Sequence, residues 1–253
     1  MAELPSLIQR GLQTKFIGRK IIYYPSLPST MDAAREAARG GAKAGTVIIA
    51  EEQTAARGRL KREWLSPPGN IALSIILYPD IAYLHYLIMI ASLAAVHAME
   101  TAAGVKAQIK WPNDVLIDGK KVCGILIENE IKEKRAIFSI IGIGINVDMD
   151  TKAHPEISAT AASLQGKDLR VKITRSLLTE FERLYIILPE GGAIFKAWRD
   201  RLVTPGKKVR ATTGKKVIEG TAEAVDESGA LMIRGADGTL TKVVAGDVTL
   251  RDK

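Results

Sequence analysis

Residues 107–147 read AQIKWPNDVLIDGKKVCGILIENEIKEKRAIFSIIGIGINV. Apolar runs rich in isoleucine and valine alternate here with short polar breaks, which is typical of strands joined by tight turns. Asp118-Gly119 favours a two-residue hairpin turn, and Lys132-Glu133-Lys134 separates two longer apolar runs. These breaks are too short for helical crossovers, so the strands predict an antiparallel or mixed sheet rather than a doubly wound one.

Helices are predicted before and after this block in the sequence. Apolar residues recur there with a helical period, and glycines or prolines end the pattern, over residues 83–103, 173–188 and 193–202. A shorter helix is expected after Ser29 or Thr30, either of which is a good N-cap. Residues 1–203 are therefore expected to form one α+β domain, in which a mixed and largely antiparallel sheet is flanked by helices.

The sequence after Thr204 has a different texture. Five short alternating apolar segments follow one another there, separated by turns that contain glycine, and Pro205-Gly206 marks the boundary. Several short strands with closely spaced turns predict a small β-barrel. Residues 204–253 are therefore expected to form a second domain.

The composition is that of a globular protein with an anionic partner. The 253 residues are 47% hydrophobic and 25% charged, and the formal net charge is +8. A single cysteine, Cys123, excludes an internal disulfide and a cysteine-based zinc site. The N-terminus lacks the pattern of a secretory signal, and the longest apolar stretch is interrupted by His85, Ser92 and His97. We therefore expect a cytoplasmic protein that does not insert into a membrane.

A basic segment lies between two of the apolar runs. Residues 51–64 read EEQTAARGRLKREW and connect a strand expected at Thr46–Ala50 to one at Ile71–Tyr78. Four cations within residues 57–62 repel one another unless an anion lies among them, and Gly58 allows the backbone to approach a ligand. A solvated surface turn is the alternative interpretation. Only a ligand is expected to supply this anion, so the segment is expected to be mobile when the site is empty and to become ordered when the ligand binds.

Three further clusters are candidates for a binding site. Lys110–Asp114 places a lysine, an amide and a carboxylate around a proline, although a capped turn would look the same. Lys121 heads an apolar strand that contains Gly124, and a glycine inside a strand indicates either the close approach of a ligand or a bulge. In Ile141–Val147 glycines alternate with isoleucines, which leaves one face of the strand as bare backbone.

Common catalytic and nucleotide-binding motifs are absent from the sequence. It has no P-loop, no G-x-S-x-G and no H-E-x-x-H, and the glycines at 142 and 144 lack the spacing of a dinucleotide fingerprint. The three histidines have no ligand spacing to one another, so no protein-bound metal is expected. His85 and His97 are interpreted as structural residues.

Together these segments resemble the biotin protein ligase family. The residues that carry the resemblance stand in the family's order, from about residue 16 to the C-terminus: Ser29-Thr30, Gln53-Thr54, Arg57-Gly58-Arg59, Trp64, Lys110–Asp114, Lys121, Gly124–Glu128 and Gly142–Asn146. Each segment is weak alone, and their shared order and spacing make the resemblance specific. It implies a catalytic fold related to that of class II synthetases, with a C-terminal SH3-like barrel, in agreement with the two domains predicted above.

The resemblance implies an ATP-dependent ligase that forms an acyl-adenylate and then a C–N bond. Biotin, the substrate, would attack the α-phosphate of ATP, which enters with Mg²⁺ as co-substrate, to give biotinyl-5′-AMP and pyrophosphate. A lysine of a biotin carboxyl carrier protein or domain of a biotin-dependent carboxylase would then take the biotin. No covalent enzyme intermediate and no tightly bound prosthetic group are needed, which fits the lack of a nucleophile motif.

The resemblance also assigns residues to roles. Four would be catalytic: Arg57, Arg59, Lys121 and Asp114. Biotin would be bound by Ser29, Thr30, Met31, Gln53, Arg57, Gly58, Arg59, Lys121 and Gly124. ATP and the adenylate would be bound by Arg57, Arg59, Trp64, Lys110, Asn113, Lys121, Gly144 and Asn146. In this scheme fixed cations stabilise the charge at the phosphate, Trp64 stacks on the adenine, and Asp114 orients or deprotonates the incoming lysine.

Two positions depart from the family's pattern. The family has glycine where Ala56 precedes Arg57, and a positive φ there would cost alanine about 1 kcal/mol. Met31 stands where the family has asparagine after Ser-Thr. One polar contact near the biotin is therefore expected to be weakened.

Two other functions remain open from the sequence. A lipoate ligase or octanoyl transferase shares the catalytic fold, and a transferase would use a cysteine near a lysine. Cys123 follows Lys121 by two residues, so the two share a face on a regular strand, although the basic segment has no purpose in a reaction without ATP. A non-enzymatic nucleic-acid binder is disfavoured because residues 204–253 contain no aromatic residue on which a base could stack.

Partners other than the carrier protein are also predicted. Some members of the family have an N-terminal winged helix that binds DNA, and only 28 residues precede Ser29 in this chain. We therefore expect no sequence-specific DNA binding. A homodimer is possible, because family members often pair through a sheet edge.

Overall fold

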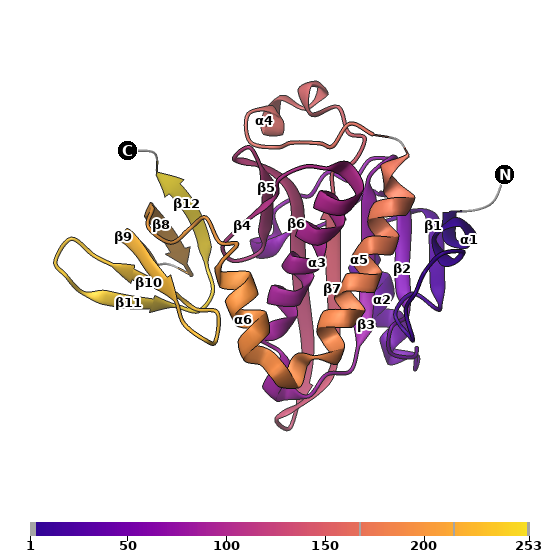
Figure 1. Ribbon diagram of the computed structural model, residues 1–253, viewed down its shortest axis with the longest axis horizontal. Coiled ribbons are helices and arrows are strands. Elements are labelled where there is room, and N and C mark those ends of the chain that lie inside the picture. The colour runs from indigo at the N-terminus through magenta and orange to yellow at the C-terminus, as the bar shows by residue number, and fades with distance from the viewer. Residues whose placement is uncertain (1–3, 167, 215, 252–253) are drawn as a thin grey trace.

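The computed structural model describes residues 4–166, 168–214 and 216–251. Within these residues the chain forms two β-sheets that share no strand. Figure 1 shows the larger sheet in the body of the molecule, with helices in front of it, and the smaller sheet to one side, near the C-terminus.

The larger sheet has seven strands in the order β1-β2-β3-β7-β6-β5-β4. Their bounds are β1 (Ile21–Leu27), β2 (Val47–Gln53), β3 (Ile71–Leu77), β4 (Gln108–Lys110), β5 (Asp114–Ile117), β6 (Lys120–Lys132) and β7 (Arg135–Ile145). The β1–β2 pair is parallel, and all the other neighbours are antiparallel. The prediction of a mixed and largely antiparallel sheet is therefore confirmed.

The two predicted turns between β5, β6 and β7 have left-handed backbone conformations. The φ angles are 49° at Asp118 and 76° at Gly119, and 49° at Glu133 and 64° at Lys134. Positive φ at both central residues is the geometry that matches the twist of a two-residue hairpin. Short hairpins therefore place these three strands side by side, as the sequence predicted.

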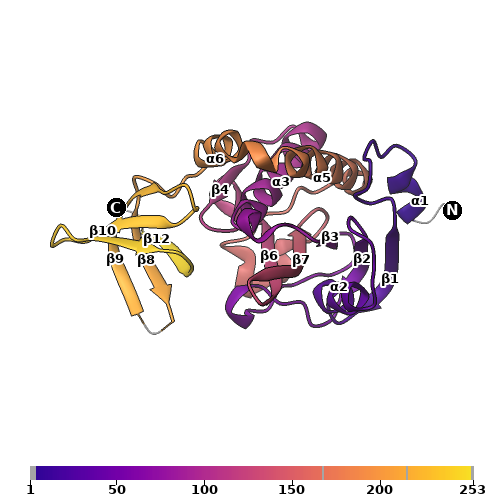
Figure 2. The ribbon, with the colours of Figure 1, turned by 90° about the horizontal axis from the view of Figure 1, so that it is seen from below.

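Helices cover both faces of the larger sheet. The α-helices are α1 (Leu4–Gln9), α2 (Thr30–Arg39), α3 (Tyr86–Ala103), α4 (Pro155–Ser158), α5 (Leu169–Ile186) and α6 (Gly191–Arg199). Single 3₁₀ turns are η1 (Arg59–Lys61), η2 (Ile81–Tyr83), η3 (Thr151–Ala153) and η4 (Leu188–Glu190). Figure 2 shows α3, α5 and α6 on one side of the sheet and α2 on the other. Every residue of β3 is buried because both faces of this central strand are covered.

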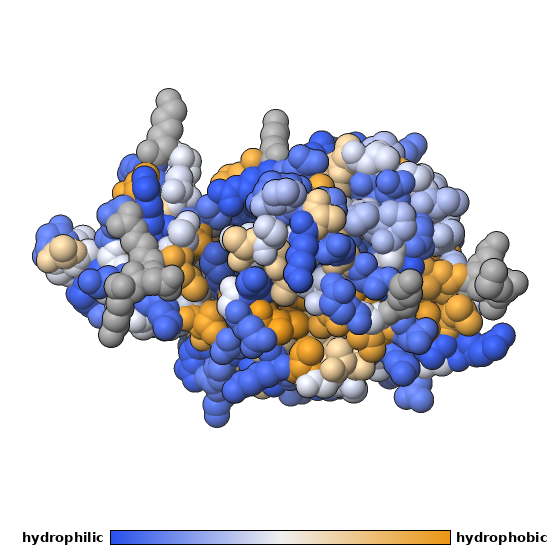
Figure 3. Space-filling view, turned by 90° about the horizontal axis from the view of Figure 1, so that it is seen from above, coloured by the Kyte–Doolittle hydropathy of each residue, from blue (hydrophilic) through white to orange (hydrophobic). Residues whose placement is uncertain are grey.

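The most apolar helix, α3, is the core helix. By length and a mean hydropathy of 1.4 it could cross a membrane, but 56% of it is buried inside this fold. Leu87, Met89 and Ile90 are fully buried in the cluster that also contains the inner residues of α5 and the sheet. Figure 3 shows a mostly hydrophilic face interrupted by apolar patches. Core packing therefore explains the apolar run between residues 83 and 103.

The smaller sheet contains the five strands predicted after Thr204. They are β8 (Lys208–Thr213), β9 (Lys216–Val225), β10 (Leu231–Arg234), β11 (Leu240–Val243) and β12 (Asp247–Arg251). All neighbours are antiparallel, in the order β11-β10-β9-β8-β12. Among the described residues β11 and β12 do not pair with each other, so the strands form an open sheet. The expectation of a closed barrel is corrected in this respect.

The two sheets meet at the turn between β4 and β5. The backbone N–H of Trp111 donates to Thr204 Oγ1 at 2.9 Å, and its indole Nε1 donates to the carbonyl of Gly229 at 2.8 Å. Trp111 is 1% exposed and precedes a cis peptide bond to Pro112. This tryptophan therefore joins the Lys110–Asp114 turn to the segment before β8 and to the turn between β9 and β10.

A buried carboxylate fixes the chain before β1. Glu182 on α5 is 4% exposed and accepts backbone N–H groups from Lys15, from Phe16 at 2.8 Å and from Ile17 at 2.8 Å. Buried N–H groups without acceptors are costly, so one side chain here satisfies three donors of the N-terminal segment.

Replacing Glu182 with glutamine should destabilise the fold. The neutral amide offers one oxygen to three N–H groups, and we expect the free energy of unfolding to fall by about 3 kcal/mol. Urea denaturation measures this as a lower midpoint with an unchanged m-value. Glu190→Gln, which changes an exposed glutamate in the following turn, is the control. Equal midpoints for the two variants would contradict the role of Glu182.

Candidate functional site

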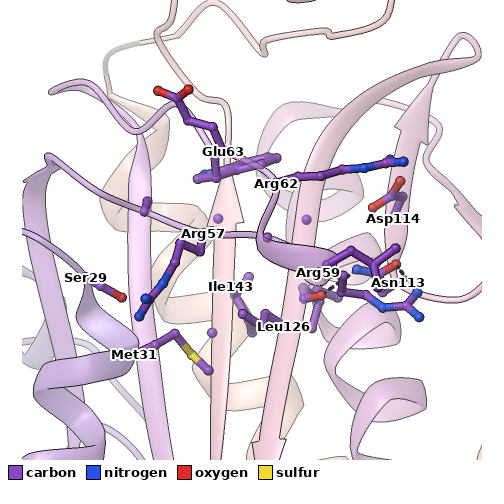
Figure 4. A pocket seen from close by; sticks show the side chains of 18 of the residues that line it. Ser29, Met31, Arg57, Arg59, Arg62, Glu63, Asn113, Asp114, Leu126 and Ile143 are labelled. Carbon is purple, nitrogen blue, oxygen red and sulfur yellow. Dashed lines mark hydrogen bonds between the residues drawn. The ribbon is translucent and has the colours of Figure 1, made fainter. Parts of the chain in front are cut away.

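A pocket of about 160 Å³ lies where the basic segment crosses the larger sheet. Its walls come from the start of α2, from Gln53 at the end of β2, from the segment between β2 and β3, from the strands β3, β5, β6 and β7, and from the start of β12. Figure 4 shows the side chains that converge on it. Segments far apart in the sequence therefore build one site.

Three glycines form the floor of the pocket. Gly124 of β6 pairs with Gly144 of β7, and Gly142 pairs with Leu126, so bare backbone is continuous across the two strands. A Cβ atom at Gly144 would lie 2.6 Å from Trp64 Nε1, and one at Gly142 would lie 2.5 Å from Met31 Sδ. The bare strand face predicted from the sequence exists, and side chains of the same chain lie directly against it.

One end of the pocket holds a hydrogen-bonded network of uncharged polar side chains. Gln53 Oε1 accepts from the backbone N–H of Thr30 at 2.8 Å and from its hydroxyl at 3.0 Å, and Ser74 donates to Thr30 Oγ1 at 2.9 Å. Gln53 Nε2 donates to Ser66 Oγ at 3.1 Å. Ser29 caps α2 beside this network without a side-chain capping bond. The predicted residues Ser29, Thr30 and Gln53 are thus brought together.

Ser74 and Ser66 support this end and were not predicted. Both are buried, and Ser74 interrupts the apolar strand β3 with a hydroxyl. That interruption was the signal in the sequence, because a polar residue in a fully buried strand needs a partner. Ser66 carries no comparable signal, since it lies in a polar connection.

The other end of the pocket is charged. Lys121 Nζ lies 2.6 Å from Asp114 Oδ1 and 5.1 Å from the centre of the Trp64 ring. Arg59 Nη1 donates to Asn113 Oδ1 at 3.1 Å, and Asn113 Nδ2 donates to the carbonyl of Ile125 at 2.7 Å. Burial lowers the pKa of Arg59 from its ordinary value, against the opposing effect of Asp114 and Asp247. Contacts with Asp114 and Asn113 therefore hold Lys121 and Arg59 in place without a ligand.

Carboxylates of the chain itself relieve the repulsion within the basic segment. Arg57 donates to both oxygens of Asp32, at 2.8 and 2.6 Å, and Arg62 donates to Asp247 at 2.6 Å. The expectation that only a ligand could supply these anions is therefore wrong. Both partners are distant in sequence, so local charge counting could not find them.

Ala56 does not carry the strain that was expected of it. The positive φ in this segment belongs to Leu60, at 55°, while Gly58 has a φ of −89°. Ala56 is 6% exposed, and its carbonyl accepts the N–H of Trp64 at 3.0 Å. The cost of about 1 kcal/mol for a left-handed residue therefore applies to Leu60 and not to Ala56.

Most of the predicted site residues line this pocket, but two do not. Lys110 lies on β4, outside the lining. Asn146 is buried and donates through Nδ2 to the carbonyl of Ala162 at 3.0 Å, so it holds a neighbouring loop. The lining also includes residues that were not assigned to the site: Ala56, Leu60, Arg62, Glu63, Leu73, Ile125, Leu126, Gly142, Ile143, Gly246 and Asp247.

Cys123 faces the core and not the pocket. On β6, Lys121 pairs with Leu116 and Cys123 pairs with Val115, so Val122 is an extra residue that forms a bulge. The bulge breaks the two-residue alternation, which makes the expectation that Lys121 and Cys123 share a face wrong. Cys123 is 0% exposed, and burial raises the pKa of its thiol. A buried thiol with a raised pKa is a poor nucleophile.

In the part of the chain that the structure describes, no group of three or more His, Cys, Asp or Glu residues gathers in a way that could bind an ion.

The sequence and the fold were compared with those of known proteins. The model of the biotin/lipoate A/B protein ligase family matches residues 23–146, and that of the biotin protein ligase C-terminal domain matches residues 204–251. The bifunctional ligase/repressor BirA of Bacillus subtilis is 36% identical over 97% of this chain and 78% of its own length. A biotin–[acetyl-CoA-carboxylase] ligase of Mycobacterium tuberculosis is 32% identical over 96% of both chains.

Solved structures agree with these matches. The biotin protein ligase from Aquifex aeolicus in complex with biotin and ATP superposes with a TM-score of 0.73 and 25% identity, over 93% of this chain and 100% of the other. The ligase from Leishmania major in complex with biotinyl-5-AMP gives a TM-score of 0.59 and 25% identity, over 90% and 99% of the two chains.

Replacing Gly144 with alanine should lift Trp64 from the pocket floor. The added methyl group would lie 2.6 Å from the indole Nε1, too close for the ring to stay in place. We expect stronger acrylamide quenching of tryptophan fluorescence in Gly144→Ala. The same substitution in a Trp64→Phe background should cause no such change. Gly192→Ala is the control, because a Cβ there meets no atom within 4 Å. Unchanged quenching in Gly144→Ala would contradict the contact.

Proposed function

Because the chain belongs to the biotin protein ligase family, we propose that its glycine-floored pocket binds biotin at the polar end and the phosphates of ATP at the charged end. The enzyme is an ATP-dependent biotin protein ligase, which makes biotinyl-5′-AMP and transfers biotin to a protein lysine. The observation that carries the proposal is the arrangement of the pocket. A hydrogen-bonding end, a bare backbone floor and fixed cations follow one another in one cavity.

The polar end suits the ureido ring of biotin. Ser29, Thr30 and Gln53 offer hydroxyl and amide groups there, held by the hydrogen bonds to Thr30. Trp64 and Met31 now lie against the glycines at 124, 142 and 144, so the remainder of a flat ligand would lie against the strands after these side chains move aside. Met31, buried over Gly142, adds an apolar contact instead of the amide that the family pattern has.

The charged end suits the reacting groups. In the first step a carboxylate oxygen of biotin bonds to the α-phosphorus of ATP, and the bond to pyrophosphate breaks. Negative charge gathers around this phosphorus, and preorganised cations lower the barrier because they need not reorganise. Arg59 and Lys121 would supply this charge, and Arg57 and Gly58 also line the pocket. Asn113 orients Arg59, and Trp64 covers the adenylate.

The second step forms an amide. The amine of the acceptor lysine attacks the acyl carbon, the bond to AMP breaks, and the amine loses a proton. Asp114 lies 2.6 Å from Lys121, so its carboxylate is close to the bridging oxygen that Lys121 would contact. We propose that Asp114 orients the incoming lysine ammonium group and removes a proton from it. Lys110 and Asn146 receive no ligand contact, because both lie outside the pocket.

Several finer points belong to the same proposal. ATP would enter with Mg²⁺, and the acceptor would be a biotin carboxyl carrier domain of a biotin-dependent carboxylase. Residues 1–203 and 204–253 would be the catalytic and the SH3-like C-terminal domains, with Asp247 of the second bound to Arg62 of the first. A cytoplasmic location, no membrane insertion, no sequence-specific DNA binding and a possible homodimer stay predictions.

Biotinyl-AMP formation is the direct test. The protein incubated with ATP, Mg²⁺ and biotin should yield biotinyl-5′-AMP by mass spectrometry, with lipoate and octanoate as poor competitors. Lys121→Gln should lower the rate of its formation about 10²- to 10³-fold, because one preorganised charge is lost. Lys120→Gln, the exposed neighbour, is the control. Equal rates for both variants would remove Lys121 from the mechanism.

Cys123→Ala should retain the activity of the wild-type protein. The cysteine is buried away from the pocket, so the variant loses only a small amount of packing, about 1 kcal/mol. Adenylate formation and transfer to a carrier domain are measured side by side. Loss of transfer with normal folding would favour covalent catalysis of the octanoyl transferase kind.

A further inference from the structure

Asp32 holds a residue of the pocket although it does not line the pocket itself. It stands in the first turn of α2, directly after Met31, and its two carboxylate oxygens accept from Arg57 Nη2 at 2.8 and 2.6 Å. Arg57 does line the pocket. Asp32 is not among the site residues predicted from the sequence.

This contact turns Arg57 away from the other cations of the site. In Figure 4 the guanidinium of Arg57 lies beside Ser29 and Met31, while Arg59 lies at the opposite side with Asn113. The proposed chemistry requires positive charge where a carboxylate meets a phosphate. While Asp32 binds it, the charge of Arg57 is already neutralised at the biotin end.

Asp32 has a second cation to which it remains bound if Arg57 leaves. Arg35 Nη1 lies 2.7 Å from Asp32 Oδ1, and the same guanidinium also pairs with Glu128 of β6. The side chains of Arg57 and Asp32 are 51% and 41% exposed. Ion pairs of this exposure contribute little to stability, so Arg57 can exchange partners at low cost.

We propose that Asp32 is a positioning residue that competes with the oxyanions of the ligand for Arg57. The proposal rests on the function assigned above, in which Arg57 contacts the carboxylate or phosphate of the acyl-adenylate. In the ligand-free enzyme Asp32 anchors Arg57 and with it the basic segment to α2. When the adenylate binds, its oxyanion takes Arg57, and Asp32 keeps Arg35.

Asp32→Asn removes the competing charge and should tighten binding of the adenylate. The probe is a hydrolysis-resistant analogue of biotinyl-AMP, titrated calorimetrically into the full chain. We expect its dissociation constant to fall about two- to fivefold, which corresponds to the free energy that a half-exposed ion pair contributes. Trypsin should cut the ligand-free variant within residues 57–62 faster than it cuts the ligand-free wild-type protein. Once both proteins are saturated with the analogue, they should be cut at equal rates.

Three controls separate competition from a structural effect. Glu36→Gln makes the same change of charge one turn along α2, on an exposed side chain, and should leave the affinity unchanged. Asp32→Glu keeps the charge and should restore wild-type affinity. In an Arg57→Ala background, Asp32→Asn should have no effect, because the two residues act as a coupled pair.

The outcomes distinguish this proposal from the one on which it rests. If the wild-type protein makes biotinyl-AMP and Asp32→Asn binds the analogue equally or more weakly, the competition is refuted. An effect of Asp32→Asn that persists without Arg57 refutes it too. Asp32→Ser, which also suits the first turn of a helix, replaces Asp32→Asn should that variant misfold. A wild-type protein that forms no biotinyl-AMP overturns both proposals.

Discussion

The pairing of β6 with β7 determines where this protein can hold a ligand. Gly124 stands opposite Gly144, and Gly142 stands opposite Leu126. A shift of the register by one residue would turn isoleucines toward the pocket and glycines toward the core. The buried isoleucines of both strands, Ile125, Ile141, Ile143 and Ile145, prevent that shift because they fill the core under α3. The core and the pocket therefore depend on the same register.

The electrostatics of the site follow from a second constraint. Four cations line the pocket, and three of them are paired with single carboxylates from three separate elements, while Arg59 is bound by the amide of Asn113. Asp32 comes from α2, Asp114 from β5 and Asp247 from β12. All three ion pairs are partly exposed, so each is weak compared with a buried pair. A site arranged in this way is ordered and can still exchange an internal anion for that of a ligand.

A bulge of one residue decides on which face Lys121 lies. Cys123 pairs with Ile145 of β7 and is turned to the core by the same register that puts Gly124 on the pocket face. On a regular strand Lys121 would share the core face with Cys123, and the extra residue Val122 moves it to the pocket. The register therefore buries the thiol, and the bulge supplies the cation.

The local structure and most of the pocket residues could be predicted from the amino-acid sequence. Alternating apolar residues and Asp-Gly turns specify strands and hairpins, and the glycines of β7 predict a bare strand face, because these signals depend on near neighbours only. Tertiary structure alone decided the partners of the cations, the side of the strand on which Cys123 lies, and the share of the second sheet in the pocket. Arg62 and Asp247 are 185 residues apart in the chain, and Arg57 and Asp32 are 25 apart. No local pattern encodes such pairs, since they form only when packing of the core brings their elements together.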